Sequence, residues 1–363
     1  MASLRHWAVA ASLALAPLAF LVTFSAAAAE TPPALQKIID GAKAEGALSL
    51  QYGGGILGTA EGAQVAAQGI KKMFGVNLNV TYAPGPSFAP MASRLYTELQ
   101  AKQKASTDVY YGTAVQISPY LQRGLFRKID WSGLYPGRIT PDIVEGEGQA
   151  LRIATGLPGV LYNKRAYPQF AKIETTADML KPEYKGKIYT QPYLAGFDVL
   201  VASDEWGYAK TEAYVRKFSA QIGGLVRCGE PDRLASGEVP ALAIDCTGTE
   251  QNLAKYRDVL GLQIMRDAAM RRYDYVCIPE NAAHPNAGIL FALYASSPEG
   301  QKRILIDLFG NALDSYPDNA THEQIAALEK SGVVFRDVTI PWWSAQKGIE
   351  DNLKKLIKLV AEH

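Results

Sequence analysis

The stretch Ala47-Leu-Ser-Leu-Gln-Tyr52, continuing as Gly53-Gly-Gly-Ile-Leu-Gly58, is the part of the chain that indicates its fold. The first six residues are typical of a buried strand, and the glycine-rich segment is typical of a loop that leads into a helix. Thr59 is a candidate N-cap for a helix that runs to Phe74, and Gly75 is a typical helix stop. The pattern therefore predicts a strand, a tight loop and a helix in succession.

The same alternation continues on both sides of this stretch. Residues 34–42 have helical spacing, and residues 76–82 alternate as a strand. A helix over 91–104, a short strand over 108–111 and a helix near 118–123 follow. This strand–helix order with short connections predicts a parallel sheet covered by helices on both faces.

Two further blocks complete the chain. Residues 152–162 contain Gly156, Pro158 and Gly159 and are typical of an extended crossing segment. The second block is again α/β, with strands predicted over 186–190, 224–228 and 239–245 and helices over 210–220 and 232–236. The third block is mainly helical, with helices predicted over 286–296, from Ser297-Pro298 to Gly310, from a capping box of Thr321 and Gln324 to Gly332, and along the stripe Ile349, Leu353, Leu356 and Val360.

The first thirty residues have the pattern of a secretory signal peptide. A basic head at Arg5 precedes the uncharged run Trp7–Phe24, and Ala27 and Ala29 satisfy the small-x-small rule for cleavage. We expect residues 1–29 to be removed and the mature protein to work in the periplasm. The alternative is an uncleaved anchor, since the apolar run is just long enough to span a membrane, but Pro17 favours cleavage.

The composition excludes several classes of function. Lys and Arg total 37 against 36 Asp and Glu, and a net charge of +1 provides no field for nucleic acid. Histidine is scarce, and the motifs HExxH, CxxC and GxSxG are absent from the sequence. We therefore expect a protein that is not an enzyme and has no cofactor, metal centre or catalytic set.

The loop Gly53–Gly58 satisfies the GxGxxG pattern of dinucleotide-binding loops and lies between a strand and a helix. The next strand ends Thr81-Tyr82-Ala83, however, without the acidic residue that would hold a ribose. Export would also remove the protein from the supply of nicotinamide cofactors. A ligand loop or a simple turn is the favoured interpretation.

Four stretches resemble the type II periplasmic solute-binding proteins of ABC importers, a group that includes ferric-iron binders. They are Ile38–Tyr52, Gly156-Leu-Pro-Gly-Val-Leu-Tyr-Asn163, Leu180-Lys-Pro-Glu-Tyr-Lys-Gly-Lys-Ile188, and His284-Pro-Asn-Ala287 continuing to Ser297-Pro-Glu-Gly-Gln301. The resemblance implies an α/β fold of two lobes, each with a mainly parallel sheet, joined by two crossover segments with the ligand in the cleft between them. Lobe one would comprise residues 30–152 and 280–363, and lobe two residues 153–279.

Ligands of such sheets meet the loops beyond the carboxyl ends of the strands. Helix N-termini after several of these loops favour an anionic group, and aromatic side chains supply apolar contact. Asp245 could pair with a cationic group or cap the next helix, and both alternatives remain open. The predicted ligand-binding residues are Tyr52, Gly54, Gly55, Ser87, Phe88, Thr113, Tyr193, Phe197, Asp245 and Thr247.

The chain departs from the ferric-iron binders that it resembles. Those proteins have adjacent tyrosines in the loop that here reads Asp245-Cys-Thr-Gly-Thr249. The pair Tyr110-Tyr111 lies within a predicted strand, where alternation sends the two rings to opposite faces. We therefore expect a small organic solute, with an anionic group such as a carboxylate or phosphonate, rather than a ferric ion.

The sequence thus predicts a monomeric periplasmic receptor that presents its solute to an ABC permease. The alternatives are a ferric-iron receptor, a periplasmic α/β enzyme acting on a phosphate-bearing substrate, and the sensing partner of a membrane signalling protein. Cys228 and Cys246 end neighbouring predicted strands and are candidates for a disulfide, with Cys277 as a buried thiol. The residues Trp342 and Trp343 could line the cleft mouth or pack the tail.

Overall fold

The computed structural model describes residues 31–202, 204–227, 230–244 and 253–361. The predicted signal segment 1–29 lies outside the described residues, as do Cys228, Asp245, Cys246 and Thr247. Among the helices of the described ranges, none is long and apolar enough to cross a membrane.

The first part of the described chain alternates helix and strand as the sequence predicts. Strands β1 and β2 pair in parallel, with Leu50 opposite Tyr82. Helix α2 ends at Gly75 in the left-handed conformation, but its N-cap is Gly58, so the predicted cap at Thr59 is wrong. Thr59 itself has a positive φ of 54°, and among the described residues no side chain bonds the N-terminus of the helix as a cap. The elements are α1 (Pro33–Glu45), β1 (Ala47–Tyr52), α2 (Thr59–Phe74), β2 (Asn79–Pro84), α3 (Phe88–Gln100), β3 (Tyr110–Thr113) and α4 (Ala114–Leu121).

We call the sheet that contains strand β11 the first sheet. Its strand order is β12-β11-β5-β4, and β3 also pairs with β11. Strands β3 and β5 run antiparallel to β11, whereas β12 is parallel to it. The bounds are β4 (Val144–Glu145), β5 (Ala150–Gly156), β11 (Met270–Cys277) and β12 (Arg336–Val338).

The second sheet has the strand order β10-β6-β9-β7-β8. Strand β7 is parallel to β8 and β9, and β6 is antiparallel to β9 and β10. The strands are β6 (Val160–Asn163), β7 (Ile188–Thr190), β8 (Gly224–Leu225), β9 (Ala241–Leu242) and β10 (Leu260–Gln263), and the helices between them include α6 (Phe197–Leu200), α7 (Gly207–Ser219) and α8 (Pro231–Ala235).

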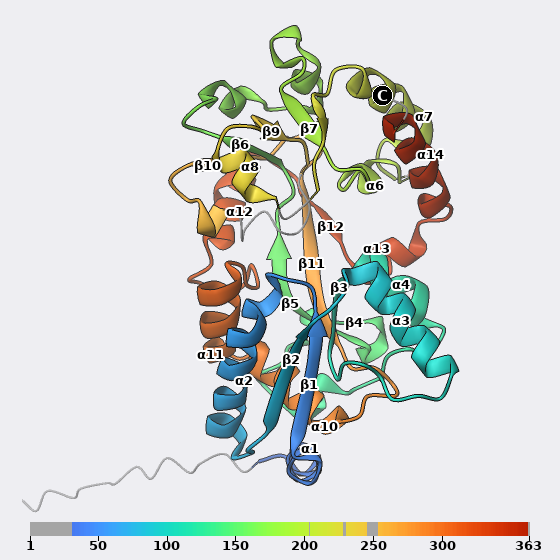
Figure 1. Cartoon of the computed structure of the whole chain (residues 1–363), viewed down its shortest axis with the longest axis vertical. Helices are drawn as coiled ribbons and strands as arrows, with labels where there is room; N and C mark the ends of the chain where they lie inside the picture. Colours follow the sequence, from blue (N-terminus) through green and yellow to red (C-terminus); the bar gives the residue numbers. More distant parts are fainter. Residues whose placement is uncertain (1–30, 203, 228–229, 245–252, 362–363) are drawn as a thin grey trace, which may run out of the picture. The chain divides into compact units, whose positions relative to one another are not determined.

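The α/β fold class is confirmed, but the sheets are mixed rather than mainly parallel. Residues 157–159 lead from β5 in the first sheet to β6 in the second, and residues 264–269 lead back from β10 to β11. Figure 1 shows both connections between the two sheets. Because the chain crosses in opposite directions, β5 is antiparallel to β11 and β6 is antiparallel to β10. The predicted crossing over 152–162 is confirmed.

The return to the first sheet occurs earlier than the boundary expected at 279. Strand β11 pairs with β3 and β5, so residues 270–277 belong to the first sheet. The two connections pack together in one small core beneath helix α12 (Ala320–Lys330). That core contains Leu157 from one connection and Ile264 and Ala269 from the other, with Ile325 of α12.

The C-terminal helices pack both on the part of the chain that contains the first sheet and on the part that contains the second sheet. The predicted cap at Ser297 is confirmed. Helix α12 is capped by Asn319, whose side chain accepts a hydrogen bond from Thr321 N at 3.2 Å, so the predicted capping box at Thr321 is wrong. Helix α13 packs against α4, whereas α14 packs against α7 and α6. The chain after 280 therefore does not lie against the first sheet alone. The elements are α10 (Pro285–Ala295), α11 (Pro298–Gly300), a π-helical segment (Gln301–Phe309), α13 (Ile340–Ala345) and α14 (Ile349–Ala361).

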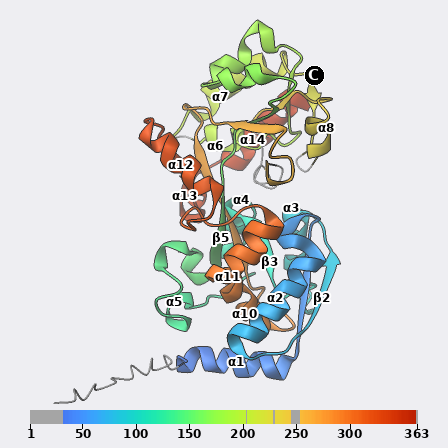
Figure 2. The same ribbon diagram turned by 90° about the vertical axis from the view of Figure 1, so that its left-hand side faces the viewer.

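Apolar side chains form two large cores on opposite faces of the first sheet. One core packs α1, α2 and α10 around β1, as Figure 2 shows from the side, and includes Tyr111. The other core includes Tyr110, so the prediction that these two rings pack on opposite faces is confirmed. The buried free thiol of Cys277 lies in the same core as Tyr110, also as predicted. Short helical segments complete the fold: α5 (Trp131–Leu134), and single turns at Ile56–Gly58, Pro141–Ile143, Gly146–Gly148, Pro168–Lys172, Thr176–Leu180 and Pro182–Tyr184.

Candidate functional site

The loop after β1 is held in a strained conformation. Gly55 and Gly58 have φ of 83° and 72°, and the non-glycine residues Leu57 and Thr59 also have positive φ, at 47° and 54°. A left-handed conformation costs a non-glycine residue roughly 1–2 kcal/mol. Strain of this kind collects at ligand clamps and active sites, where the surrounding structure maintains it.

Tyr52 ends β1 with its ring in the core. The ring packs on Tyr82 at 5.1 Å between centroids, and burial raises the pKa of Tyr52 above its ordinary range. Among the described residues, no side chain or backbone group hydrogen-bonds its buried hydroxyl. The ring is therefore structural, and the buried hydroxyl has an unused bonding capacity.

The loop after β2 contacts the loop after β1 through the backbone. Gly85 N donates to Tyr52 O at 2.9 Å. Ser87 is exposed at the N-cap of α3 and makes no capping bond through its side chain. Phe88 packs on Tyr111 at 5.4 Å. The predicted residues of these two loops are thus neighbours in the structure.

Thr113 lies at the end of β3 and at the start of α4. Its hydroxyl donates to Gln116 Oε1 at 2.7 Å, and its backbone N–H donates to the same oxygen at 3.2 Å. The side chain is buried. In this structure the hydroxyl of Thr113 therefore takes part in capping the N-terminus of α4.

The loop after β7 contains the second group of predicted residues. Tyr193 has 42 % of its surface exposed, which is high for a tyrosine beside a buried strand. Phe197, in contrast, is fully buried and packs on Phe218 at 5.5 Å and on Tyr214 at 6.0 Å. The ring of Phe197 thus belongs to the core and does not face a ligand in this structure.

The loops after β7 and β9 are joined by a buried amide. Gln191 Nε2 donates to Ala243 O at 3.4 Å and to Ile244 O at 3.2 Å. Leu194 and Ile244 again have positive φ, at 49° and 39°. Four of the six described non-glycine residues with positive φ therefore lie in the loops after β1, β7 and β9, the loops in which the sequence predicts the ligand.

A buried ion pair near these loops was not predicted from the sequence. Arg272 on β11 and Asp198 on α6 bond each other, with only 6 % and 4 % of their surfaces exposed. Asp198 directly follows the β7 loop. The signal that could have revealed Arg272 is a cation two residues before Asp274 in the largely buried strand Met270–Cys277.

A second buried charge cluster holds the first sheet to α13. Glu145 accepts from Arg152 and from Tyr275 Oη at 2.9 Å, and also from Ile340 N at 2.7 Å. Burial raises the pKa of Tyr275, and the Glu145 charge adds to this effect. Arg152 also lies 3.5 Å above the ring of Tyr273. Glu145 thereby links β5 and β11 to the start of α13.

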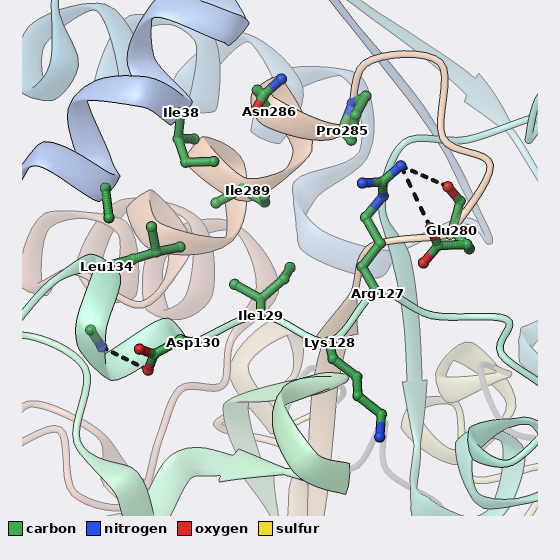
Figure 3. Close-up of a pocket in the computed structure, with 12 residues that line it drawn as sticks. Ile38, Arg127, Lys128, Ile129, Asp130, Leu134, Glu280, Pro285, Asn286 and Ile289 are labelled. Atoms are coloured by element: carbon green, nitrogen blue, oxygen red, sulfur yellow. Dashed lines mark hydrogen bonds and ion pairs between the residues drawn. The ribbon is translucent and has the colours of Figure 1, made fainter.

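A cavity of about 480 Å³ lies elsewhere, between α1, α5 and the start of α10. Figure 3 shows Arg127 at its edge, where Nη2 donates to Glu280 O at 2.8 Å. Ile38, Ile129 and Ile289 form its apolar wall. None of the predicted ligand-binding residues lines this cavity, so it is separate from the candidate site.

The tryptophan pair in α13 divides between packing and polar contact. Trp343 is buried and belongs to the core that contains Tyr110. Trp342 Nε1 donates to Asp204 Oδ2 at 2.9 Å. Trp343 therefore packs in the core, and Trp342 links α13 to the segment before α7.

Comparisons with known proteins give one family match and many similar structures. A family model described as bacterial extracellular solute-binding protein matches residues 66–330. No curated protein matches the chain. Three similar solved structures are each distant in sequence. A substrate-binding protein of an ABC transporter from Agrobacterium tumefaciens is 16 % identical, with a TM-score of 0.67, covering 86 % of this chain and 94 % of that one.

Two other structures show the range of ligands that this fold accommodates. The periplasmic binding protein AfuA from Actinobacillus pleuropneumoniae, solved with fructose-6-phosphate, has a TM-score of 0.65 at 16 % identity and covers 87 % of this chain and 99 % of that one. The apo ferric ion-binding protein A from Pasteurella haemolytica has a TM-score of 0.63 at 16 % identity, with 87 % and 97 % covered. At these identities the likeness shows the fold alone, which is that of type II periplasmic binding proteins.

Proposed function

The chain belongs to the family of bacterial extracellular solute-binding proteins, and we propose that it is the periplasmic receptor of an ABC importer for a small organic anion. The family match over residues 66–330 is the observation that carries the role of receptor. The protein would bind its solute between two lobes, one built on the first sheet and one on the second. The two connections at 157–159 and 264–269 would serve as the hinge.

The positions of the strained loops support a ligand site between the sheets. The loops after β1, β2 and β3 come from the first part of the fold, and those after β7 and β9 come from the second sheet. Tyr52, Gly54, Gly55, Ser87, Phe88 and Thr113 are the candidate contacts on one side, and Tyr193 is the candidate on the other. Asp245 and Thr247 stay candidates from the sequence alone, because they lie outside the described residues. Phe197 is no longer a candidate for direct contact, because its ring is in the core.

Ferric iron is the main alternative ligand, since a ferric ion-binding protein has the same fold. The tyrosine pair of this chain does not favour it. Tyr110 Oη donates to Phe88 O at 3.0 Å, and Tyr110 and Tyr111 pack into different cores, so the two rings cannot converge on one ion. An organic solute is therefore the favoured ligand class.

A thermal-shift screen of the mature protein against a solute library tests the proposal. A true ligand should raise Tm in proportion to the logarithm of its concentration, and at about 100 times its Kd it should contribute about 2.7 kcal/mol. Tyr193→Ala should then weaken binding while leaving the fold intact, because the ring is largely exposed. The matched control is Tyr208→Ala on α7, a tyrosine outside the predicted loops whose ring lies against Lys355 of α14.

Two results would count against the proposal. A coloured complex with ferric citrate that has a tyrosinate charge-transfer band, together with indifference to organic solutes, would establish the iron receptor instead. Equal loss of binding in Tyr193→Ala and Tyr208→Ala would remove the loop after β7 from the site. Permease and ATPase genes beside this one would support transport, whereas a kinase gene there would support a sensing role.

A further inference from the structure

The strand position of Arg272 is two residues from the partner of Thr113, a candidate ligand-binding residue. Arg272 lies opposite Gly156 of β5 and opposite Val338 of β12. It is two residues from Asp274, which pairs with Thr113 at the end of β3. Side chains two apart on a strand share one face, so Arg272 is in line with the loop after β3. Gly156 opposite it has no side chain, which leaves room for the guanidinium group.

The partner of Arg272 comes from the other side of the site. Asp198 is the second residue of α6, and α6 begins directly after the loop that contains Tyr193. The ion pair therefore joins strand β11 of the first sheet to the start of α6, directly after the loop that follows β7. Both side chains are more than nine-tenths buried.

The guanidinium group of Arg272 is incompletely bonded. Its Nη2 donates to Asp198 Oδ1, but its buried Nε has no hydrogen-bond partner among the described residues. A buried donor without a partner is costly. A guanidinium group also binds best through two parallel bonds to two oxygens of one anion. The arrangement leaves one such donor unused.

We propose, on the basis of the proposed function, that Arg272 recognises the carboxylate or phosphate group of the solute and that Asp198 is an internal competitor for it. In the ligand-free protein the carboxylate of Asp198 neutralises the buried guanidinium group. A solute anion would take the place of Asp198 and engage Nε as well. The solute therefore has a group with at least two anionic oxygens, and a cationic solute is disfavoured.

The two members of the pair should respond in opposite directions, which a purely structural ion pair would not do. The test uses the mature full-length protein with succinate and inorganic phosphate as anionic probes and spermidine as the cationic one. Asp198→Asn removes the competing charge and should tighten binding of at least one anion by about tenfold, the size expected for one charge-assisted bond. Arg272→Gln should abolish binding of the same anion. Isothermal titration calorimetry measures both affinities.

Two further variants separate binding from folding. Arg272→Lys keeps the charge but loses the fork geometry, so it should weaken the anion without abolishing it. The double variant Asp198→Asn with Arg272→Gln buries no charge at this position, so it should remain folded by circular dichroism and still fail to bind the anion. This result is the readout if Arg272→Gln alone does not fold.

The outcomes distinguish this inference from the proposed function. If the wild type binds a solute and neither Asp198→Asn nor Arg272→Gln changes its affinity, the pair is structural and the inference is overturned, while the receptor function stands. If Arg272→Gln strengthens spermidine binding, the site is cationic and the inference is overturned. If the wild type binds no member of the solute library, the proposed function and the inference fail together.

Discussion

The carboxylate of Glu45, at the end of α1, holds Asn286 in the first turn of α10, more than two hundred residues further along the chain. Glu45 Oε1 accepts from Asn286 N at 3.1 Å and from Asn286 Nδ2 at 2.6 Å, and Oε2 accepts from Ala287 N at 2.8 Å. His284, the N-cap residue of α10, makes no capping bond through its side chain. A distant acid thus satisfies the N–H groups that a local cap would otherwise bond.

Glu45→Ala should therefore lower the free energy of unfolding by about 1–2 kcal/mol, the usual cost of a lost cap. Urea unfolding followed by circular dichroism measures the loss. Glu61→Ala, an exposed acid in the first turn of α2, is the control and should change stability by less than about 0.5 kcal/mol. Equal losses in the two variants would contradict the role of Glu45.

Asp178 gives a prediction that depends on pH. The Lys181 ammonium group at 2.7 Å, followed by hydrogen bonds from Thr175 and Glu174, lowers the pKa of Asp178 from 3.8 to about 2. Because the pKa in the folded state is depressed, the stabilisation is fully present above about pH 4 and is lost as the pH falls towards 2.

Asp178→Asn should cost about 1 kcal/mol at neutral pH, since the exposed lysine is screened and a cap is weakened. The difference between wild type and variant should shrink between pH 4 and pH 2. Unfolding curves at several pH values measure it. A difference that stayed constant down to pH 2 would show that the carboxylate charge is not involved.

At Gly69 in α2, the gain in helix propensity from a larger residue competes with the cost of crowding a neighbouring side chain. A Cβ atom at this position would lie 2.0 Å from Tyr294 Cζ of α10. Alanine is favoured over glycine in a helix by about 1 kcal/mol, but overpacking in a core costs typically 1–3 kcal/mol. We expect Gly69→Ala to destabilise the protein, and the double variant with Tyr294→Leu to recover part of the loss. If the stability changes of Gly69→Ala and Tyr294→Leu simply added in the double variant, the proposed contact between these two positions would be refuted.

The signal peptide remains a prediction, since residues 1–29 lie outside the described part. The mature protein should begin at or near Glu30 and be recovered from the periplasm in soluble form. Intact-mass measurement of the periplasmic protein would check this. Recovery of the segment Trp7–Phe24 in a membrane fraction would support the uncleaved anchor.

The disulfide between Cys228 and Cys246 is also untested, because both residues lie outside the described ranges. A bond would require their Cα atoms to be within about 7 Å, and it would close a short loop that contributes roughly 3 kcal/mol in chain-entropy models. Thiol counting on the denatured, unreduced protein should find only Cys277 free. A count of three thiols would end the prediction.

The sequence alone predicted the order of elements in the first block and several helix ends, but strands β10, β11 and β12 were not predicted. Apolar spacing and punctuation by glycine are local signals, which is why the stop at Gly75 and the cap at Ser297 agree with the structure. The placement of the adjacent rings of Tyr110 and Tyr111 in different cores also agrees with the alternation of side chains along a strand. Errors at Thr59 and Thr321 arose where a neighbouring residue, Gly58 or Asn319, took the capping position instead.

The candidate site was only partly accessible from the sequence. The rule that ligands meet the carboxyl ends of strands located the loops, and the structure finds backbone strain in the loops after β1, β7 and β9. The rule could not tell which side chain in a loop turns inward. Phe197 and Tyr193 are four residues apart, yet one ring is in the core and the other is exposed.

What the sequence determined by itself is a set of local choices: the helices and strands of the first block, the longer helices after it, and the loops between them. Only the tertiary structure decided that β11 returns to the first sheet between β5 and β12 and that α14 lies against α7. The pairing of Arg272 with Asp198 belongs to the same class, since 74 residues separate the two. Such contacts depend on the direction in which the chain crosses between the sheets, and a local pattern of apolar and polar residues carries no information about that direction.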